Sequence, residues 1–170
     1  MGYYLYKKTK SSNVLTASSG DFCLFSPNLL RHRIKGERIG CKNRISRIYL
    51  WLISRGNAKI VYVKSADSLI MHTSCVMSKC KKFTFMRDND FEIGPCVTKD
   101  EYRGQGIYPR VLNYITSSFG EDGAVFYMIV EENNTSSIKG IEKAGFEKCG
   151  VVQKSRFLKK YYVEEENVNE

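Results

Sequence analysis

The sequence has few of the residues that bind metal ions or form disulfide networks. It contains two histidines, three prolines and six cysteines in 170 residues, and no two cysteines form a Cys-x-x-Cys pair. Zinc-ligand spacing is therefore absent, and we expect no metal site. Scattered cysteines are typical of free thiols in a reducing compartment, so we expect a cytoplasmic protein.

Long hydrophobic runs and linkers are missing as well. No segment reaches the roughly 20 apolar residues that cross a bilayer, so no membrane insertion is expected. Residues 1–8 lack the apolar region of a signal peptide. No repeat and no Pro- or Gly-rich linker divides the chain. These absences favour one domain over residues 1–163, followed by an acidic tail at residues 164–170.

The sequence does have a globular composition and an excess of positive charge. Hydrophobic residues make up 42% and charged residues 26%, which is enough to build a packed core. Lys and Arg number 27 against 18 Asp and Glu, for a formal net charge of +9. Such a surface attracts nucleic acids, anionic membranes or phosphate-rich cofactors. Because the basic residues are spread along the chain, we expect no nucleic-acid partner.

The hydrophobic pattern from residue 58 onward predicts a mixed α/β fold. Strands are expected at residues 59–64, 69–77, 91–98, 124–130, 146–152 and 156–163. Helices are expected after Gly106 and after Asn134, where the residue types suit helix starts. The dipeptide Gly94-Pro95 interrupts one strand and predicts a bulge or a strand separation there, because proline cannot donate to a ladder.

The N-terminal third of the chain is the hardest part to assign. Short strands are expected at residues 15–17 and 22–25, before a basic, turn-prone run at residues 31–42. Residues 44–54 place apolar side chains on one helical face. This segment predicts either a helix that packs on the core or a helix that lies on a membrane surface.

A glycine-rich turn follows the strand at residues 91–98. The run Arg103-Gly104-Gln105-Gly106-Ile107 leads into a helix, whose first N–H groups have no partner within the helix. Glycines let a phosphate approach these amides, and the helix dipole favours an anion there. The run matches neither the GxxxxGK[ST] nor the GxGxxG nucleotide motif. By itself it predicts either an anion site or an ordinary structural turn.

Two longer segments resemble motifs of the GNAT superfamily of N-acetyltransferases. Residues 92–107 read EIGPCVTKDEYRGQGI and resemble motif A, in which a strand runs into a pyrophosphate-binding loop. Residues 134–146 read NTSSIKGIEKAGF and are similar to motif B. The two motifs occur in the family's order, with a helix and a strand between them.

The resemblance implies an α/β fold with a mixed sheet, a GNAT-like single domain whose splayed central strands admit the pantetheine arm of acetyl-CoA, the co-substrate. An N–H near Cys96 would stabilise the oxyanion. Asn134 matches an asparagine that contacts the pantetheine or caps the next helix. By match, the remaining cofactor-binding residues are Cys96, Val97 and Thr98 for the pantetheine, and Arg103, Gly104, Gln105, Gly106, Ile107 and Tyr108 for the pyrophosphate.

The implied chemistry needs a base, because the attacking amine must be neutral. Glu92 matches a strand position from which many family members offer a carboxylate, so it is the first candidate. His72 is the second, because the intrinsic pKa of histidine suits proton transfer near neutral pH. A salt-bridged glutamate and a structural histidine are the alternatives. Direct attack in a ternary complex is the family norm, and an acyl group carried on Cys96 is the alternative.

Two positions depart from the family pattern. The motif B tyrosine, which can protonate the departing thiolate, falls at Ile141, and the small residue that closes the loop falls at Tyr108. An aliphatic side chain cannot donate a proton, so either another hydroxyl serves or the thiolate leaves without help. Tyr108, Ser136 and Ser137 are the nearby candidates. A weak or inactive transferase is the remaining alternative.

The resemblance therefore implies an acyl-CoA-dependent N-acyltransferase that acetylates an amine of a small acceptor. Amino sugars and surface-polysaccharide precursors are the expected acceptors, while a protein or peptide acceptor stays open. A non-catalytic CoA-binding or regulatory module is the alternative, and Ile141 favours it. A monomer or a homodimer is expected.

Overall fold

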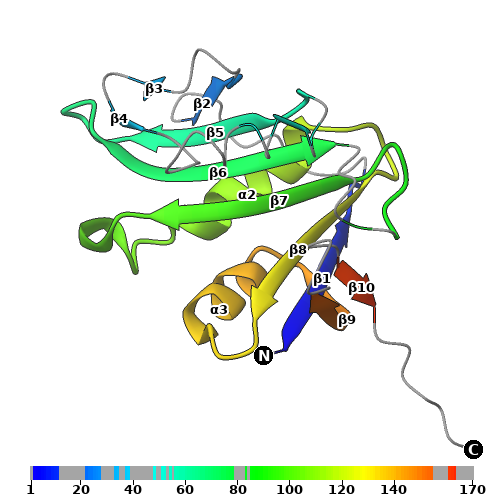
Figure 1. Ribbon diagram of the computed structural model, residues 1–170. Coiled ribbons are helices and arrows are strands. Elements are labelled where there is room, and N and C mark those ends of the chain that lie inside the picture. The colour runs from blue at the N-terminus through cyan, green and yellow to red at the C-terminus, as the bar shows by residue number, and fades with distance from the viewer. Residues whose placement is uncertain are drawn as a thin grey trace, which may run out of the picture.

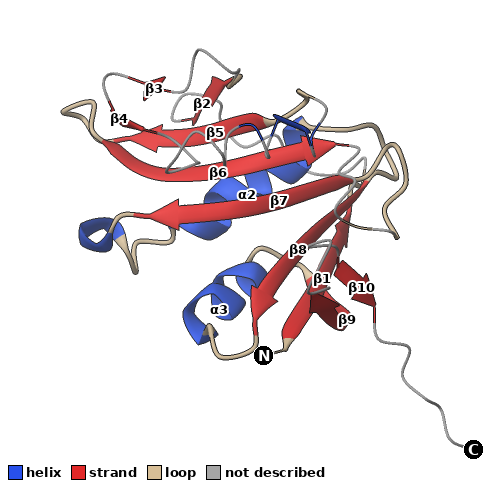
Figure 2. Cartoon of the chain, viewed as in Figure 1, coloured by secondary structure: helices blue, strands red, loops and turns tan. Residues whose placement is uncertain are grey.

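The computed structural model describes residues 2–11, 22–27, 33–34, 37–38, 48, 51–52, 54, 56–78, 83, 85–154 and 161–163. The strands in this part of the chain are β1 (Tyr3–Thr9), β2 (Phe22–Phe25), β3 (Arg33–Ile34), β4 (Glu37–Arg38), β5 (Lys59–Lys64), β6 (Ile70–Ser78), β7 (Phe91–Thr98), β8 (Val125–Glu131), β9 (Glu147–Lys154) and β10 (Tyr161–Val163). The helices whose bounds are described are the 3-10 helix η2 (Asp100–Tyr102), α2 (Ile107–Ser118) and α3 (Thr135–Lys143), and residues 48, 51–52 and 54 are helical as well (Figure 2).

One large mixed sheet organises these elements. Eight strands follow the order β10-β9-β1-β8-β7-β6-β5-β2, and β3 and β4 pair separately. Within the large sheet only β7 and β8 are parallel neighbours, among the residues described. Helix α2 lies against β5, β6 and β7, and α3 lies next to α2 (Figure 1). This arrangement confirms the mixed α/β fold predicted from the sequence.

The sheet buries an apolar cluster on each face, because side chains alternate along its strands. On β5, Val61 belongs to the cluster beneath the helices, whereas Ile60 belongs to the cluster on the opposite face. Helix α2 presents Val111, Leu112 and Ile115 to the first cluster, and all three are 0% exposed. Their spacing places them on one helical face, as the sequence pattern predicts.

The central strands β7 and β8 splay apart. They pair only at their first residues, Phe91 with Phe126 and Glu92 with Tyr127. Beyond these pairs the two strands diverge, which Figure 1 shows as a V between their arrows. The edge of β7 that faces β8 is therefore left without a strand partner over the rest of its length.

A bulge in β7 accompanies this separation. Ser74 of β6 pairs with Cys96, and Val76 pairs with Ile93, so the two residues Gly94-Pro95 lie opposite a single residue of β6. An extra residue of this kind bends a strand and increases its twist. The bulge and the strand separation expected at Gly94-Pro95 are both present.

Strand β1 was not predicted from the sequence, although it lies in the sheet between β8 and β9. Two consecutive residues, Leu5 and Tyr6, are buried at 3% and 2%, because they point to opposite faces of the sheet and each face is covered by an apolar cluster. A strand that is buried on both faces lacks the alternation of apolar and polar residues that would indicate a half-buried strand.

The remaining N-terminal predictions are tested only in part. The strand expected at residues 22–25 is β2, and the basic run at residues 31–42 contains the short pair β3 and β4. The strand expected at residues 15–17 and the tail at residues 164–170 lie outside the described residues. Most of the helix expected at residues 44–54 does too, but its described residues, 48, 51–52 and 54, are helical. No helix in the described part of the chain has the length and apolar character needed to span a membrane.

Candidate functional site

The glycine-rich turn opens directly onto a helix N-terminus. Gly104 and Gly106 have φ angles of 76° and 71°, which L side chains rarely adopt. No atom lies within 4 Å of where a Cβ would stand at either position. The glycines are therefore required by the backbone conformation and leave open space beside the loop.

The start of helix α2 determines where the backbone N–H groups of this loop point. Gly106 is the N-cap, and no side chain caps the helix there. In the described chain, the backbone hydrogen bond nearest the helix start runs from the N–H of Arg110 to the carbonyl of Gly106, at 3.3 Å. The preceding N–H groups are those that an α-helix leaves without intrahelical acceptors, so they can bind an anion.

The loop forms one wall of a cleft of about 630 Å³. Arg103, Lys139 and Lys143 are among its lining residues, and no aspartate or glutamate in the described part of the chain is. A concave site with charge of one sign concentrates ligands of the opposite sign. The cleft is lined by His72, Cys96, Val97, Thr98, Tyr102, Arg103, Gly104, Gly106, Ile107, Tyr108, Pro109, Asn134, Ser136, Ser137, Lys139, Gly140 and Lys143.

Nine of the cofactor-binding residues expected from motifs A and B line this cleft. Gln105 belongs to the same loop but is not part of the lining, and its side-chain amide donates to the carbonyl of Glu101 at 3.3 Å. Arg103 is exposed, with its guanidinium 2.8 Å from the Asp100 carboxylate. Asn134 caps α3, because its side-chain oxygen accepts from the N–H of Ser137 at 3.2 Å.

A line of polar side chains crosses from β6 to β7 beneath the cleft. His72, which is 1% exposed, has Nδ1 at 2.7 Å from Thr98 Oγ1 and Nε2 at 2.7 Å from Ser74 Oγ. Ser74 in turn donates its hydroxyl hydrogen to Cys96 Sγ at 3.2 Å. Ser74 must then accept from Nε2–H, and Nδ1 accepts from Thr98. Burial lowers the pKa of His72 to about 4, so the ring is neutral at pH 7.

Tyr108 joins this line of polar groups from helix α2. Its hydroxyl is hydrogen-bonded to the thiol of Cys96, and its ring centroid lies 5.6 Å from that of His72. Loss of solvation around the sulfur raises the pKa of Cys96 to about 11, so it stays a thiol at pH 7. Sequence reasoning did not find this network, because it depends on the register that the β7 bulge sets.

Glu92 and His72, the two candidate bases, lie on opposite faces of the sheet. Glu92 pairs with Met77, whose side chain belongs to the cluster on the face opposite the helices. His72 pairs with Val63, whose side chain packs beneath the helices. Paired residues share a face, so Glu92 points away from the cleft. Glu92 is 5% exposed, and its charge nevertheless contributes to the raised pKa of Cys96.

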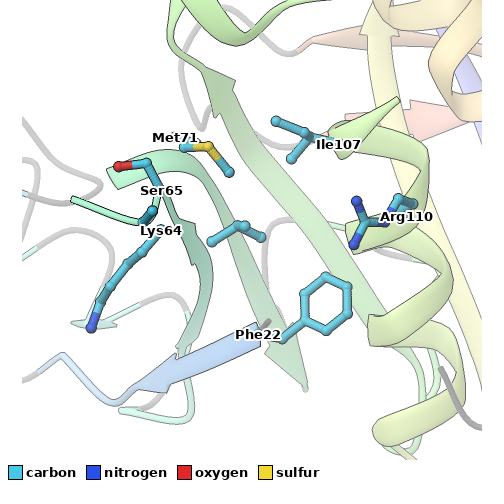
Figure 3. Close-up of a pocket in the computed structure, with 8 residues that line it drawn as sticks. Phe22, Lys64, Ser65, Met71, Ile107 and Arg110 are labelled. Carbon is cyan, nitrogen blue, oxygen red and sulfur yellow. The ribbon is translucent and has the colours of Figure 1, made fainter. Parts of the chain in front are cut away.

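A second cavity of about 330 Å³ lies near the start of helix α2 and is lined by Phe22, Val63, Lys64, Ser65, Ala66, Met71, Ile107 and Arg110 (Figure 3). Ile107 lines this cavity and the cleft, so its side chain lies where the two meet. Arg110 adds a further cation on the first turns of the helix, whereas the Lys64 ammonium points away from α2 and lies 5.2 Å from the centroid of the Tyr62 ring (Figure 3). The charge of Arg110 adds to the positive potential that favours an anion at the loop.

The fold and the cleft together define a GNAT-type architecture. The structure is similar to a GNAT-family acetyltransferase from Colwellia psychrerythraea, with a TM-score of 0.57 and 17% identity over 87% of this chain and 53% of that one. It is also similar to a GNAT-family protein from Novosphingobium aromaticivorans, with a TM-score of 0.54 and 15% identity over 88% of this chain and 61% of that one. The chain has the GNAT fold, and it spans between half and two thirds of each neighbour's length.

Sequence comparisons add no further relatives. No protein-family model matches the sequence, and no curated protein matches it. Among the described residues, no group of three or more His, Cys, Asp or Glu side chains is placed to hold a metal ion. What the chain binds is therefore argued from the cleft itself.

Proposed function

We propose that this chain is an acyl-CoA-dependent N-acyltransferase that transfers an acetyl group from acetyl-CoA to an amine of a small acceptor. One observation carries the proposal: a splayed strand edge leads directly into an open glycine loop at a helix N-terminus. The two features suit the two ends of one ligand, because an extended amide-containing arm can pair with a strand edge and a diphosphate can bind helix amides.

The residues present fit this ligand. The free edge of β7 offers the backbone of Cys96, Val97 and Thr98 to the two amides of the pantetheine arm. The consecutive backbone N–H groups from Gly104 to Tyr108 would bind the diphosphate. The described lining of the cleft brings Lys139, Lys143 and Arg103, the last of which is paired with Asp100, to a ligand with several negative charges. Acetyl-CoA would supply the activated acyl group.

Two groups are proposed for the proton of the acceptor amine. Glu92 forms the last pair between β7 and β8, so its carboxylate lies at the closed end of the gap on the face opposite the helices. An amine that enters from that face would meet it. His72 is neutral and lies in the cleft, but both of its ring nitrogens are already hydrogen-bonded, and its low pKa makes it a weak base. We therefore place Glu92 first.

A non-catalytic CoA-binding module is the second candidate function. Ile141 favours it, because this aliphatic side chain is 1% exposed and packs in the core at the position where a proton donor would be expected. Such a module would bind CoA in the same cleft without turning it over.

A turnover assay separates the two candidates. Acetyl-CoA is incubated with amines that include amino sugars, nucleotide-linked amino sugars, amino acids and a lysine peptide, and CoA release is followed with product detection by mass spectrometry. The transferase predicts an acetylated product from at least one small amine. Tight acetyl-CoA binding with no product from any amine would favour the module.

A further inference from the structure

The tyrosine at position 108 and the glycine at position 140 form a matched pair across two helices. A Cβ at Gly140 would stand 2.6 Å from Cδ1 and 3.0 Å from Cε1 of Tyr108. Both distances are shorter than van der Waals contact, so only glycine leaves room for the ring. The ring of Tyr108, which belongs to α2, therefore packs against α3 at Gly140.

The hydroxyl of Tyr108 is directed at a sulfur atom. It is hydrogen-bonded to the Cys96 thiol, on the part of β7 that follows the bulge and lines the cleft. Loss of solvation raises the pKa of Tyr108, so the hydroxyl keeps its proton and acts as a donor. A hydroxyl that donates to one sulfur in this position can donate to a second sulfur that is brought beside it.

Tyr102 and Ser137 also bring hydroxyls to the cleft, but neither is hydrogen-bonded to a sulfur in the described structure, and three other hydroxyls near the site have different partners or no access. Ser136 donates to the Asn134 side chain at 3.2 Å, and Thr98 lies 2.7 Å from His72. Ser74 is 0% exposed and is not among the residues that line the cleft. Tyr108 therefore combines access to the cleft with a proton directed at sulfur.

We propose that Tyr108 is the acid that protonates the sulfur of CoA as it leaves. This inference rests on the proposed transferase function. As the amine forms the new C–N bond, the C–S bond breaks and its electron pair stays on sulfur. Tyr108 gives its hydroxyl proton to that sulfur, the base takes the proton that the amine loses and releases it to solvent, and Tyr108 regains a proton from solvent once the thiol has left. Tyr108 thus supplies from α2 the proton donor that Ile141 cannot supply from α3, and Gly140 leaves room for its ring.

A binding measurement tests the contact without any acceptor. Affinities for CoA and for a CoA analogue that lacks the sulfur are compared by calorimetry from neutral pH to above the thiol's pKa, which is about 8.5 for a cysteine. The wild type should prefer CoA increasingly as the thiolate forms, because a hydrogen bond to a charged group favours that form by about tenfold or more. Tyr108→Phe should lose this preference while it keeps its affinity for the analogue.

Two further variants sharpen the result. Gly140→Ala should reproduce the loss, because its methyl group displaces the ring of Tyr108 without removing the hydroxyl. Tyr114→Phe is the matched control on the same helix. Its ring stacks on Phe22 with centroids 4.3 Å apart, outside the residues that line the cleft, so it should behave as wild type. A preference for CoA that survives in Tyr108→Phe overturns the inference.

A kinetic test of the same contact compares two acyl donors that differ in their leaving group. With acetyl-CoA, Tyr108→Phe should lower kcat by about 100-fold, which is at the low end for a lost acid catalyst. With an acetyl thioester of an acidic aromatic thiol, which leaves without protonation, the variant should approach the wild-type rate. An equal loss with both donors would contradict the acid role. Failure of the wild type to bind either CoA or the analogue would instead defeat the proposed function.

Discussion

The Asp90 carboxylate accepts a hydrogen bond from the Val125 N–H at 3.4 Å and so joins the start of β7 to the start of β8. Its second oxygen accepts from the N–H of Arg87 at 2.8 Å, and the side chain is 3% exposed. Asp90 therefore holds the closed end of the V, from which the two strands diverge toward the cleft.

Replacing Asp90 should destabilise the fold. Asp90→Ala leaves two backbone N–H groups without their acceptor in a buried site, so the free energy of unfolding should fall by about 1–3 kcal/mol. Urea denaturation measures this fall in the free energy of unfolding. Asp122→Ala, at an exposed position in the turn before β8, is the control and should change stability by less than about 0.5 kcal/mol. Equal effects of the two substitutions would show that Asp90 does not join the strands.

The buried histidine predicts a pH dependence of stability. Burial lowers the pKa of His72 from 6.5 to about 4, so the folded chain binds its proton less readily than the unfolded chain. The contribution of the neutral His72 side chain to the free energy of unfolding is complete above pH 6.5 and is lost progressively as the pH falls toward 4. At 1.36 kcal/mol per pH unit the loss amounts to about 3 kcal/mol.

Denaturation at several pH values measures this effect as a difference between two slopes. His72→Gln should show a shallower fall in unfolding free energy between pH 6.5 and 4 than the wild type. Carboxylates titrate in the same range in both proteins, so they cancel in the comparison. Identical slopes would mean that His72 is protonated as readily in the folded chain as in the unfolded one.

The outcome for particular residues shows what the sequence can and cannot reveal. The bulge at Gly94-Pro95 and the helix cap at Asn134 were predicted, because both follow from local rules on proline and on side-chain capping. The approach of Tyr108 to Cys96 was not, because these residues come from different elements and meet only through the register of β6 and β7. The burial of Ile141 is likewise a matter of tertiary packing. Strand β1 was missed because both of its partners, β8 and β9, are distant in sequence.

The glycine loop can be tested with a matched pair of substitutions. Gly106→Ala and Gly123→Ala both place a side chain at positive φ, 71° and 82°, with no atom within 4 Å of the new carbon. Each should cost about 1–2 kcal/mol of stability. Only Gly106→Ala should also weaken acetyl-CoA binding, because Gly123 lies in the turn before β8, away from the cleft. Equal affinities in calorimetry would remove the loop from the binding site.

The assignment of Glu92 as base is tested by an isosteric change. Glu92→Gln keeps the size of the side chain and removes its ability to accept a proton, so turnover should fall by about 100-fold or more. The stabilisation by acetyl-CoA should be unchanged, because Glu92 does not line the cleft. Glu121→Gln is an exposed control and should keep full activity. A fully active Glu92→Gln enzyme would shift the role to His72 or to solvent.

The most direct test of the account is thermal unfolding in increasing concentrations of acetyl-CoA. Specific binding to the folded chain should stabilise it by RT ln(1 + L/Kd), about 2.7 kcal/mol at a hundredfold excess over Kd. For a chain of this size we therefore expect a rise in Tm of about 5–10 °C, and a smaller rise for Gly106→Ala at the same concentration. An unchanged Tm at millimolar acetyl-CoA would contradict the claim that the splayed strand and the glycine loop hold this ligand.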